Sequence, residues 1–461
     1  MEVSAKTRNS IFYVLLFNSI VAAFSQTVLN TALAPIMNDM GIGPGTGQWL
    51  ISAFSLVMGI MVLATAFLIR RFSCRRLYLV SVCFFSMGLL IAAISPNFIV
   101  LLIGRIFQGI SSGILVSQTQ VLILTAFPPQ ERGSKMGIFG LAASAAPVLS
   151  PLVAGIVIDN YGWRMIFWGA FTASLVVLVI GFIVVKDITE TQISKFDIPS
   201  FMLCSIGFIG IIIGLGHLGG QEISVANIFI PIAVGLIALV LFIARQQKLP
   251  EPFLQLVVFK NRELRIAVIS IMILFCVTIA TATILPLYIQ SIRGFSATTA
   301  GLIVMPGSLL TALVSPIAGK IYDKVGIRKL YLCGASLMLA GHVALCFLTL
   351  STPIPILILS FSLFQISIGL LLMPTITWGM STLDSRYTSD GTAVINSLRT
   401  IGGAIGAALF ISVMTMASRG DEPAIYGVNI AFIGIALLSL TMLVIAILFV
   451  GRQRGIYTPL P

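Results

Sequence analysis

The chain has 461 residues, of which 58% are hydrophobic and only 9% are charged, and its formal net charge is +12. Soluble domains carry about 25% charged residues, so the composition excludes a soluble exterior and most of the surface must face lipid. The positive charge does not indicate nucleic-acid binding, because the basic residues lie in short connections between apolar segments, as in membrane proteins.

The apolar segments have lengths that suit membrane-spanning helices. The first of them, which begins at Ile11, is too long for the core of a signal peptide. Because a helix needs about 20 apolar residues to cross a bilayer, we expect an all-α integral membrane protein with about fourteen spans. In chain order the expected spans are 11–33, 48–69, 77–95, 99–126, 136–158, 165–185, 198–219, 226–244, 265–286, 298–318, 330–350, 354–378, 391–415 and 428–450.

The basic residues predict the orientation of these spans. Most of the 27 Lys and Arg residues fall in one set of alternate connections, whereas only Arg164, Arg293 and Arg419 fall in the other set. Positively charged connections stay on the cytoplasmic side of the membrane. We therefore expect both termini in the cytoplasm, which requires an even number of spans.

A short internal repeat indicates two related halves. The sequence RRLYL at 75–79 returns as RKLYL at 328–332, eight expected spans later. Because eight is an even number, both copies have the same orientation, as in the parallel halves of transporters. We expect a six-helix bundle over residues 1–186, an inserted pair of helices over 187–250 and a second six-helix bundle over 251–461.

The connection after the tenth expected span carries a family motif. Residues 319–329, GKIYDKVGIRK, resemble the loop signature of the major facilitator superfamily, which joins the second and third helices of each half in that family. The resemblance implies a conformational latch: Gly319 lets the helices approach, and Asp323 pairs with basic residues such as Arg328 or with a helix end. In the matching stretch of the first half, Arg70 stands where the family places an acid.

The fourth expected span contains an arginine inside a membrane helix. The stretch LLIGRIFQG at 101–109 resembles the second signature of the family, whose arginine, here Arg105, helps to control protonation and coupling. A charge buried in the membrane is costly and by default indicates function. In the structural alternative, neighbouring carbonyl and hydroxyl groups satisfy the guanidinium, which then braces the bundle.

The fifth and first spans narrow the resemblance to one branch. Residues 140–155, GLAASAAPVLSPLVAG, resemble the antiporter signature, and we expect Pro147 and Pro151 to bend this helix as part of the latch. The stretch TVLNTAL at 27–33 is similar to the first-helix signature of drug/proton antiporters. Together with the number of spans and the inserted pair, these motifs resemble the fourteen-helix drug:H⁺ antiporter branch, and lincomycin-type multidrug exporters in particular.

The first span lacks the acid that the resemblance implies. Those exporters place a carboxylate at what is here Ser25 or Gln26, whereas all 15 acids of this chain fall in connections or near helix ends. Glutamine imitates a protonated glutamate but cannot titrate, so Gln26 is either a loss of coupling or a residue frozen in one protonation state. We expect Gln26 and Arg105 to be the proton-coupling residues. Without a buried acid, neutral or weakly basic drugs suit the chain better than dications.

Transporter sites lie near the membrane midplane, between the two halves. Gln118 and Gln120 cannot both face inward. Two histidines, His217 and His342, could titrate near neutrality, but we expect structural or interfacial roles for them, because the family places their spans outside the central cavity. The residues expected to bind substrate are Gln26, Asn30, Gln108, Gln118, Tyr288, Gln290, Trp378, Asn396 and Arg399.

The predicted function is export of lipophilic drugs by alternating access, as a proton antiporter and a monomer in a bacterial plasma membrane. The alternative is a lipid or glycolipid flippase, or a dedicated exporter of a metabolite. A membrane enzyme would need a nucleophile, a metal cluster or paired carboxylates at depth, and the six scattered cysteines have no metal or disulfide spacing. We expect no cofactor, metal or nucleic-acid partner, and drugs, protons and membrane lipids as the partners.

Overall fold

The computed structural model describes residues 5–127, 129–187, 197–218, 224–249, 255–381, 383, 387–418 and 424–451, which form helices and connections and include no strand. Twelve helices in this part of the chain are long and apolar enough to cross a membrane. Two more segments are long enough to cross a membrane: α6 (Pro129–Tyr161) and the part of α11 (Ala297–Leu345) that follows Gly326. The shorter of them, the second part of α11, is about 28 Å long at 1.5 Å per residue. The predicted architecture of about fourteen spans is therefore confirmed.

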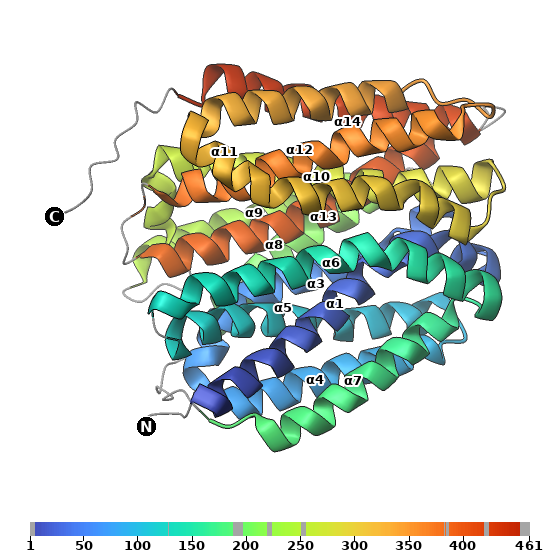
Figure 1. Ribbon diagram of the computed structural model, residues 1–461. Coiled ribbons are helices and arrows are strands. Elements are labelled where there is room, and N and C mark those ends of the chain that lie inside the picture. The colour runs from blue at the N-terminus through green and yellow to red at the C-terminus, as the bar shows by residue number, and fades with distance from the viewer. Residues whose placement is uncertain are drawn as a thin grey trace.

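The first six spans form an N-terminal bundle, coloured blue to green in the lower part of Figure 1. A short helix, α2 (Pro44–Gly47), precedes the second span. The spans are α1 (Ala5–Met40), α3 (Trp49–Arg71), α4 (Cys74–Ala93), α5 (Phe98–Ala126), α6 and α7 (Arg164–Val184).

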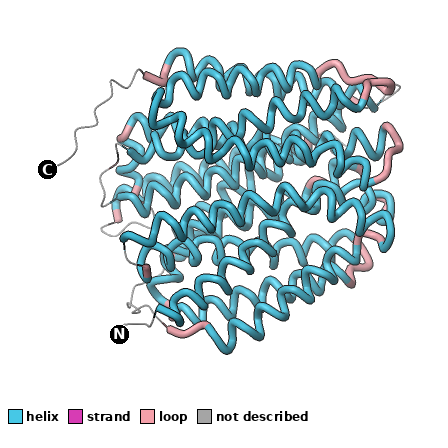
Figure 2. Tube along the Cα trace, viewed as in Figure 1, coloured by secondary structure: helices cyan, strands magenta, loops and turns pink. Residues whose placement is uncertain are grey.

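The last six spans form a C-terminal bundle, coloured yellow to red in the upper part of Figure 1. Figure 2 shows the same helices joined by short connections. The spans are α10 (Arg262–Leu287), the two parts of α11, α12 (Ile354–Ser381), α13 (Thr388–Ala417) and α14 (Ala424–Leu448), with η1 (Leu256–Lys260) before α10 and η2 (Tyr288–Ile292) after it.

Local sequence explains where several spans begin and turn. The side chains of Ser73, Asn97 and Asn261 accept hydrogen bonds from backbone amides in the first turns of α4, α5 and α10, which satisfies donors that a helix leaves unpaired. Gly326 has a φ of +74°, a left-handed conformation that glycine adopts at little cost. The helix of 297–325 therefore ends there, and the chain turns directly into the next span rather than through the longer loop that the sequence suggested.

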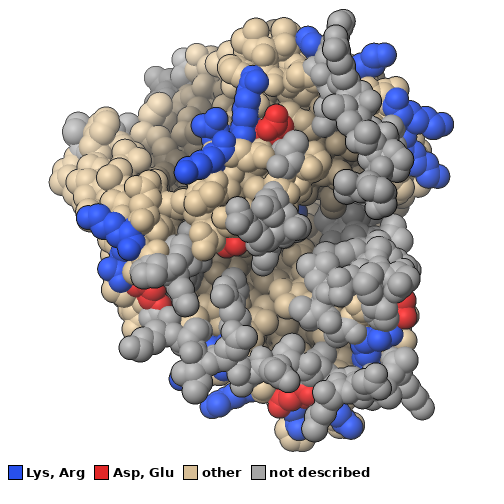
Figure 3. All heavy atoms as spheres, turned by 90° about the vertical axis from the view of Figure 1, so that its left-hand side faces the viewer, with Lys and Arg blue, Asp and Glu red and all other residues tan. Residues whose placement is uncertain are grey.

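One end of the bundle carries many basic side chains. The described chain begins and ends on the left side of Figure 1, and we call this side the terminal end and the other the opposite end. Figure 3 shows the face of the terminal end, where Lys and Arg side chains are spread around the rim and recessed, mostly uncharged surface lies nearer the middle. Large apolar side chains such as Phe229 and Ile237 of α9 are exposed on the flanks, as expected for helices that face lipid.

The predicted internal repeat is visible in the packing. Tyr78 and Tyr331 are fully buried, and each hydroxyl contacts the last span of its own bundle. Tyr78 donates to the Val177 carbonyl at 3.2 Å. The Tyr331 hydroxyl lies 3.3 Å from the Met442 sulfur and also donates to Ser270 of α10 at 2.6 Å. Gly88 and Gly341 match in the same way, because a Cβ atom on either would lie within 3 Å of a backbone carbonyl oxygen of the following span. Each glycine therefore permits the same close helix contact.

The inserted pair is α8 (Ile198–His217) and α9 (Val225–Lys248). The two helices pack closely, since a Cβ atom on Gly210 would lie 2.5 Å from the Pro231 carbonyl oxygen. At the terminal end Asp197 precedes α8 and accepts a hydrogen bond of 2.8 Å from Arg245 of α9. Burial acts to raise the pKa of Asp197, but the hydrogen bonds from Arg245 and Ser200 outweigh it and lower that pKa. The pair lies against α3 and α13 through α8.

Candidate functional site

Arg105 is the most deeply enclosed charge that the sequence singled out, with only 1% of its surface exposed. Its Nε donates to the Leu50 carbonyl oxygen at 3.2 Å, and its Nη1 donates to the Ser25 carbonyl oxygen at 3.1 Å and to Gln108 Oε1 at 2.7 Å. The guanidinium also lies 4.2 Å from the centre of the Phe54 ring. Backbone dipoles, an amide oxygen and an aromatic face therefore share this charge.

Gln108 belongs to the same network. Besides Arg105, its Oε1 accepts from the Ser25 hydroxyl at 3.1 Å, and its Nε2 donates to the Gly88 carbonyl oxygen at 3.0 Å. The residue is fully buried, and all of these partners belong to α1, α4 or α5. The predicted substrate residue Gln108 thus connects helices inside the N-terminal bundle rather than facing the other bundle.

Among the described residues, no carboxylate contacts Arg105. The acids of the spans lie at the ends: Asp39 accepts hydrogen bonds from Trp163 and Arg164 at the opposite end, and Asp197 and Glu263 lie at the terminal end. The contacts of Arg105 match the structural alternative drawn from the sequence, in which neutral acceptors brace a buried cation. No carboxylate that could accept a proton lies beside Arg105 in the described part of the chain.

The first span places Ser25 and Gln26 on different faces. Ser25 is buried against Arg105 and Gln108, whereas Gln26 is half-buried and lies one turn before Asn30, on the same side of the helix. Asn30 Oδ1 accepts a weak hydrogen bond of 3.5 Å from the hydroxyl of Thr283 on α10. Gln26 is therefore on the face of α1 turned toward the C-terminal bundle, and no hydrogen bond joins it to Arg105 in the described part of the chain.

A second polar group joins the two bundles between α5 and α13. Asn396 Nδ2 donates to Gln120 Oε1 at 3.3 Å. Arg399, one turn farther along α13, has its guanidinium 4.9 Å from the centre of the Phe275 ring of α10. Its Nε is buried and has no hydrogen-bond partner among the described residues. Arg399 is thus a half-buried cation with unused hydrogen-bonding capacity close to the boundary between the bundles.

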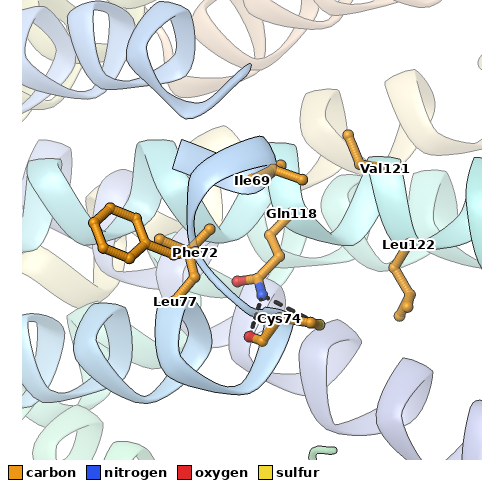
Figure 4. A pocket seen from close by; sticks show the side chains of 7 residues that line it. All are labelled: Ile69, Phe72, Cys74, Leu77, Gln118, Val121 and Leu122. Carbon is orange, nitrogen blue, oxygen red and sulfur yellow. Dashed lines mark hydrogen bonds between the residues drawn. The ribbon is translucent and has the colours of Figure 1, made fainter. Parts of the chain in front are cut away.

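Gln118 lies on another side of α5. Its Nε2 donates to the Cys74 carbonyl oxygen at 2.8 Å (Figure 4), and Ile69 and Phe72 line the same small pocket. The volume of this pocket is about 10 Å³, roughly the space needed for one water molecule. Gln118 and Gln120 cannot both face inward, and in the structure Gln120 faces the other bundle whereas Gln118 faces α4. The expectation that Gln118 lies in a drug pocket therefore differs from its observed place.

Three other predicted binding residues lie in the C-terminal part. The hydroxyl of Tyr288 donates to the Thr349 carbonyl oxygen at 2.6 Å, within the C-terminal bundle at its opposite end. Gln290 Nε2 donates to the Thr31 carbonyl oxygen at 3.1 Å, so it joins the two bundles. Trp378 is buried in the apolar core. The predicted set is therefore spread over several places, and only part of it lies where the bundles meet.

The bundles also meet between α6 and α11 at the opposite end. The Asp159 carboxylate accepts hydrogen bonds from the backbone amides of Ala297 at 3.2 Å and Thr298 at 2.8 Å, where a helix N-terminus favours negative charge. A Cβ atom on Gly155 would lie 2.6 Å from the Thr298 Cα, and one on Gly301 would meet the carbonyl oxygen of Pro151. The sequence reasoning missed Asp159 and Gly155, although the glycine stands in the motif that contains Pro151.

Three other predicted latch residues, Gly319, Asp323 and Arg328, lie at the terminal end around the turn at Gly326. A Cβ atom on Gly319 would meet nothing within 4 Å, so this arrangement does not show the close approach expected there. Arg328 is half-buried, directly after the turn at Gly326. The side chains of Pro147 and Asp323 lie outside the described part, and the latch remains a prediction.

His342 has both ring nitrogens engaged inside the C-terminal bundle. Its Nε2 lies 3.0 Å from the Thr281 hydroxyl, its Nδ1 lies 2.9 Å from the Ser439 hydroxyl, and the centre of its ring lies 4.6 Å from that of the tilted Phe364 ring. These contacts join α10, α11, α12 and α14. His217, by contrast, contacts the Ile213 carbonyl of its own helix.

We expect replacement of His342 by leucine to destabilise the protein without changing the pH dependence of transport. Loss of each buried hydrogen bond costs about 1–3 kcal/mol when a partner is left unsatisfied. The midpoint of thermal unfolding in detergent should therefore fall, and the control variant His217→Leu should change it less. A shifted pH profile of transport in His342→Leu would show that this histidine takes part in coupling.

Comparison with known proteins identifies the family. The family model of the Major Facilitator Superfamily matches residues 15–407. The chain is 34% identical over 453 residues to the "Uncharacterized MFS-type transporter YcnB" of Bacillus subtilis (strain 168), covering 97% of this chain and 96% of the relative. It is 34% identical over 412 residues to the "Lincomycin resistance protein LmrB" of Listeria monocytogenes, covering 89% and 87%.

The fold agrees with this assignment. A crystal structure of a POT family transporter in complex with 5-aminolevulinic acid matches with a TM-score of 0.71 at 15% sequence identity, over 94% of this chain and 96% of that chain. At that identity the likeness concerns the fold alone. From the family model, the relatives and the helical architecture together, the chain belongs to the major facilitator superfamily, a family of membrane transporters rather than enzymes.

Proposed function

We propose that the chain exports lipophilic small molecules, drugs and antibiotics among them, by alternating access of its two bundles. The main support is that polar side chains from both bundles face each other inside an otherwise apolar membrane protein, as in the pairs Asn30–Thr283 and Gln120–Asn396. Such pairs are typical of transporter sites between two halves. The relative named for lincomycin resistance supports the drug class of the substrate.

In this proposal the terminal end faces the cytoplasm, because Lys and Arg gather around its rim (Figure 3). The moving units are residues 1–186 and 251–461, and residues 187–250 are the inserted pair. The chain works as a monomer, since one copy holds both bundles. Neutral and weakly basic molecules suit the site better than dications, because Arg399 already places a positive charge beside it.

Drug accumulation tests the export function. Cells that express the chain should accumulate less labelled lincomycin than cells with an empty vector. The variant Asn396→Leu loses the hydrogen bond to Gln120 and a polar group between the bundles, so cells that express it should accumulate as much drug as cells with an empty vector. The control Gln247→Leu, at an exposed position of α9, should behave as the wild type. Equal accumulation of lincomycin and of other lipophilic drugs with and without the protein would favour the flippase or metabolite-exporter alternative.

Proton antiport is the coupling that we propose, and Gln26 is the position to test. A glutamate there would lie on the face of α1 turned toward α10 and would supply a carboxyl group that can gain and lose a proton. We expect drug transport by Gln26→Glu in proteoliposomes to depend more steeply on an imposed pH gradient than that of the wild type. Gln365→Glu, in the interior of the C-terminal bundle beside Ser308, is the matched control. If Gln26→Glu responds to the gradient as the wild type does, residue 26 is not the coupling position.

A further inference from the structure

A groove at the terminal end lies outside the transport site. It runs between the start of α10 and the end of α14 and has a volume of about 370 Å³. Arg262, Arg265, Ile266 and Ile269 line it from α10, at spacings that place them on one face of that helix. The other wall consists of Ile445 of α14 and of Phe449, the residue directly after this helix.

The two arginines carry charge that no described part of the protein neutralises. Both are exposed, and neither forms a hydrogen bond or an ion pair with the described residues, unlike Arg8, Arg164 and Arg245, which pair with acids. The N-terminus of α10, a helix of 26 residues, adds a partial positive charge at the same place. The part of the groove lined by Arg262 and Arg265 therefore favours an anion, and a guanidinium is well suited to bind phosphate oxygens.

The remainder of the groove is apolar and open to the flank of the bundle. Ile269 is 52% exposed and Phe449 is 48% exposed, on or directly after helices that cross the membrane. A free phosphate would use only the arginines, and a neutral lipid would use only the apolar walls. A molecule with an anionic phosphate and a hydrocarbon chain uses both, with the phosphate at the membrane surface and the chain toward its core.

We propose that this groove binds one anionic phospholipid of the membrane leaflet at the terminal end. Its phosphate lies between Arg262 and Arg265, and one acyl chain follows Ile269, Ile445 and Phe449. Because the groove lies on the outer flank, this site is separate from the proposed drug site and does not depend on it.

Native mass spectrometry of the full chain in detergent tests the proposal, with phosphatidylglycerol and phosphatidylcholine as probes. Each basic side chain near an anionic lipid strengthens binding several-fold, so we expect the wild type to bind one phosphatidylglycerol roughly tenfold more tightly than phosphatidylcholine. Arg262→Gln with Arg265→Gln should abolish this preference. Lys186→Gln with Lys248→Gln removes two exposed charges elsewhere at the terminal end and should leave it intact.

Two further measurements distinguish binding of a whole lipid from binding of a free phosphate or of an apolar chain alone. Inorganic phosphate in excess should not displace phosphatidylglycerol, since it lacks the chain, and Ile269→Asn should weaken binding of the lipid while both arginines remain. Equal loss of preference in the two double variants would overturn the proposal, because net charge alone would then explain binding. Displacement by phosphate, or wild-type affinity in Ile269→Asn, would overturn it too.

Discussion

Replacement of Arg105 by alanine is expected to abolish drug transport. The change removes the donor shared by the Leu50 and Ser25 carbonyl oxygens and by Gln108 Oε1, which then keeps only the Ser25 hydroxyl. Each hydrogen bond to a charged group contributes about 1.5–3 kcal/mol. The change also empties the space over the Phe54 ring. We expect efflux by Arg105→Ala to fall to the level of cells without the protein.

The lysine variant separates the two roles of this residue. Arg105→Lys keeps the positive charge but not the planar fork that reaches three acceptors at once. We expect it to fold, with a thermal midpoint in detergent close to that of the wild type, and to transport poorly. Wild-type transport by either variant would contradict a role for the arginine in the transport cycle, and a large loss of thermal stability in Arg105→Lys would make it a structural brace alone.

The second large effect is expected at Gly155. A valine there places a Cβ atom 2.6 Å from Thr298 Cα and 2.7 Å from the Ala297 carbonyl oxygen, and backbone atoms cannot move aside as a flexible side chain can. Since Gly155 and Thr298 belong to different bundles, the clash arises only when the bundles are closed at the opposite end. We therefore expect Gly155→Val to fold but to lose transport, because one state of the cycle becomes too costly.

The control for this variant is Gly169→Val on α7, where an added Cβ atom would meet nothing within 4 Å. Both proteins should be produced in similar amounts and elute as single species in detergent. Transport in cells should fall at least tenfold for Gly155→Val, which corresponds to a barrier raised by about 1.4 kcal/mol or more. Normal transport by Gly155→Val would mean that the contact between α6 and α11 plays no part in the cycle.

The spans could be predicted from the sequence because lipid imposes a simple rule on each segment. Every backbone amide in the bilayer must be paired within a helix, so apolar length alone locates spans such as 99–126, which the structure places at Phe98–Ala126. The internal repeat could also be predicted from the sequence, and Tyr78 and Tyr331 do occupy matching places in the two bundles.

The site could be predicted less well, because spacing does not decide how a helix is rotated. Successive residues differ by about 100° around a helix, so Gln118 and Gln120 lie on nearly opposite sides of α5, and their spacing does not say which of them meets the other bundle. Depth in the membrane also failed to distinguish a lining residue from one packed inside a bundle, as Gln108 shows by its bonds to Ser25 and Gly88. Contacts such as that of Asp159 with α11 depend on how the bundles meet, which no local pattern encodes.

The most direct test of alternating access measures the distance between the bundles at both ends. Spin labels at Tyr161 and Phe347, which are 71% and 75% exposed, report on the opposite end, and labels at the exposed Lys186 and Lys329 report on the terminal end. Cys83, Cys333 and Cys346 are replaced by serine so that only the chosen sites are labelled. When drug and a pH gradient are added, one distance should lengthen while the other shortens, and Gly155→Val should favour the state that is open at the opposite end. Two distances that stay fixed, or that change in the same direction, would contradict the proposed motion of the two bundles.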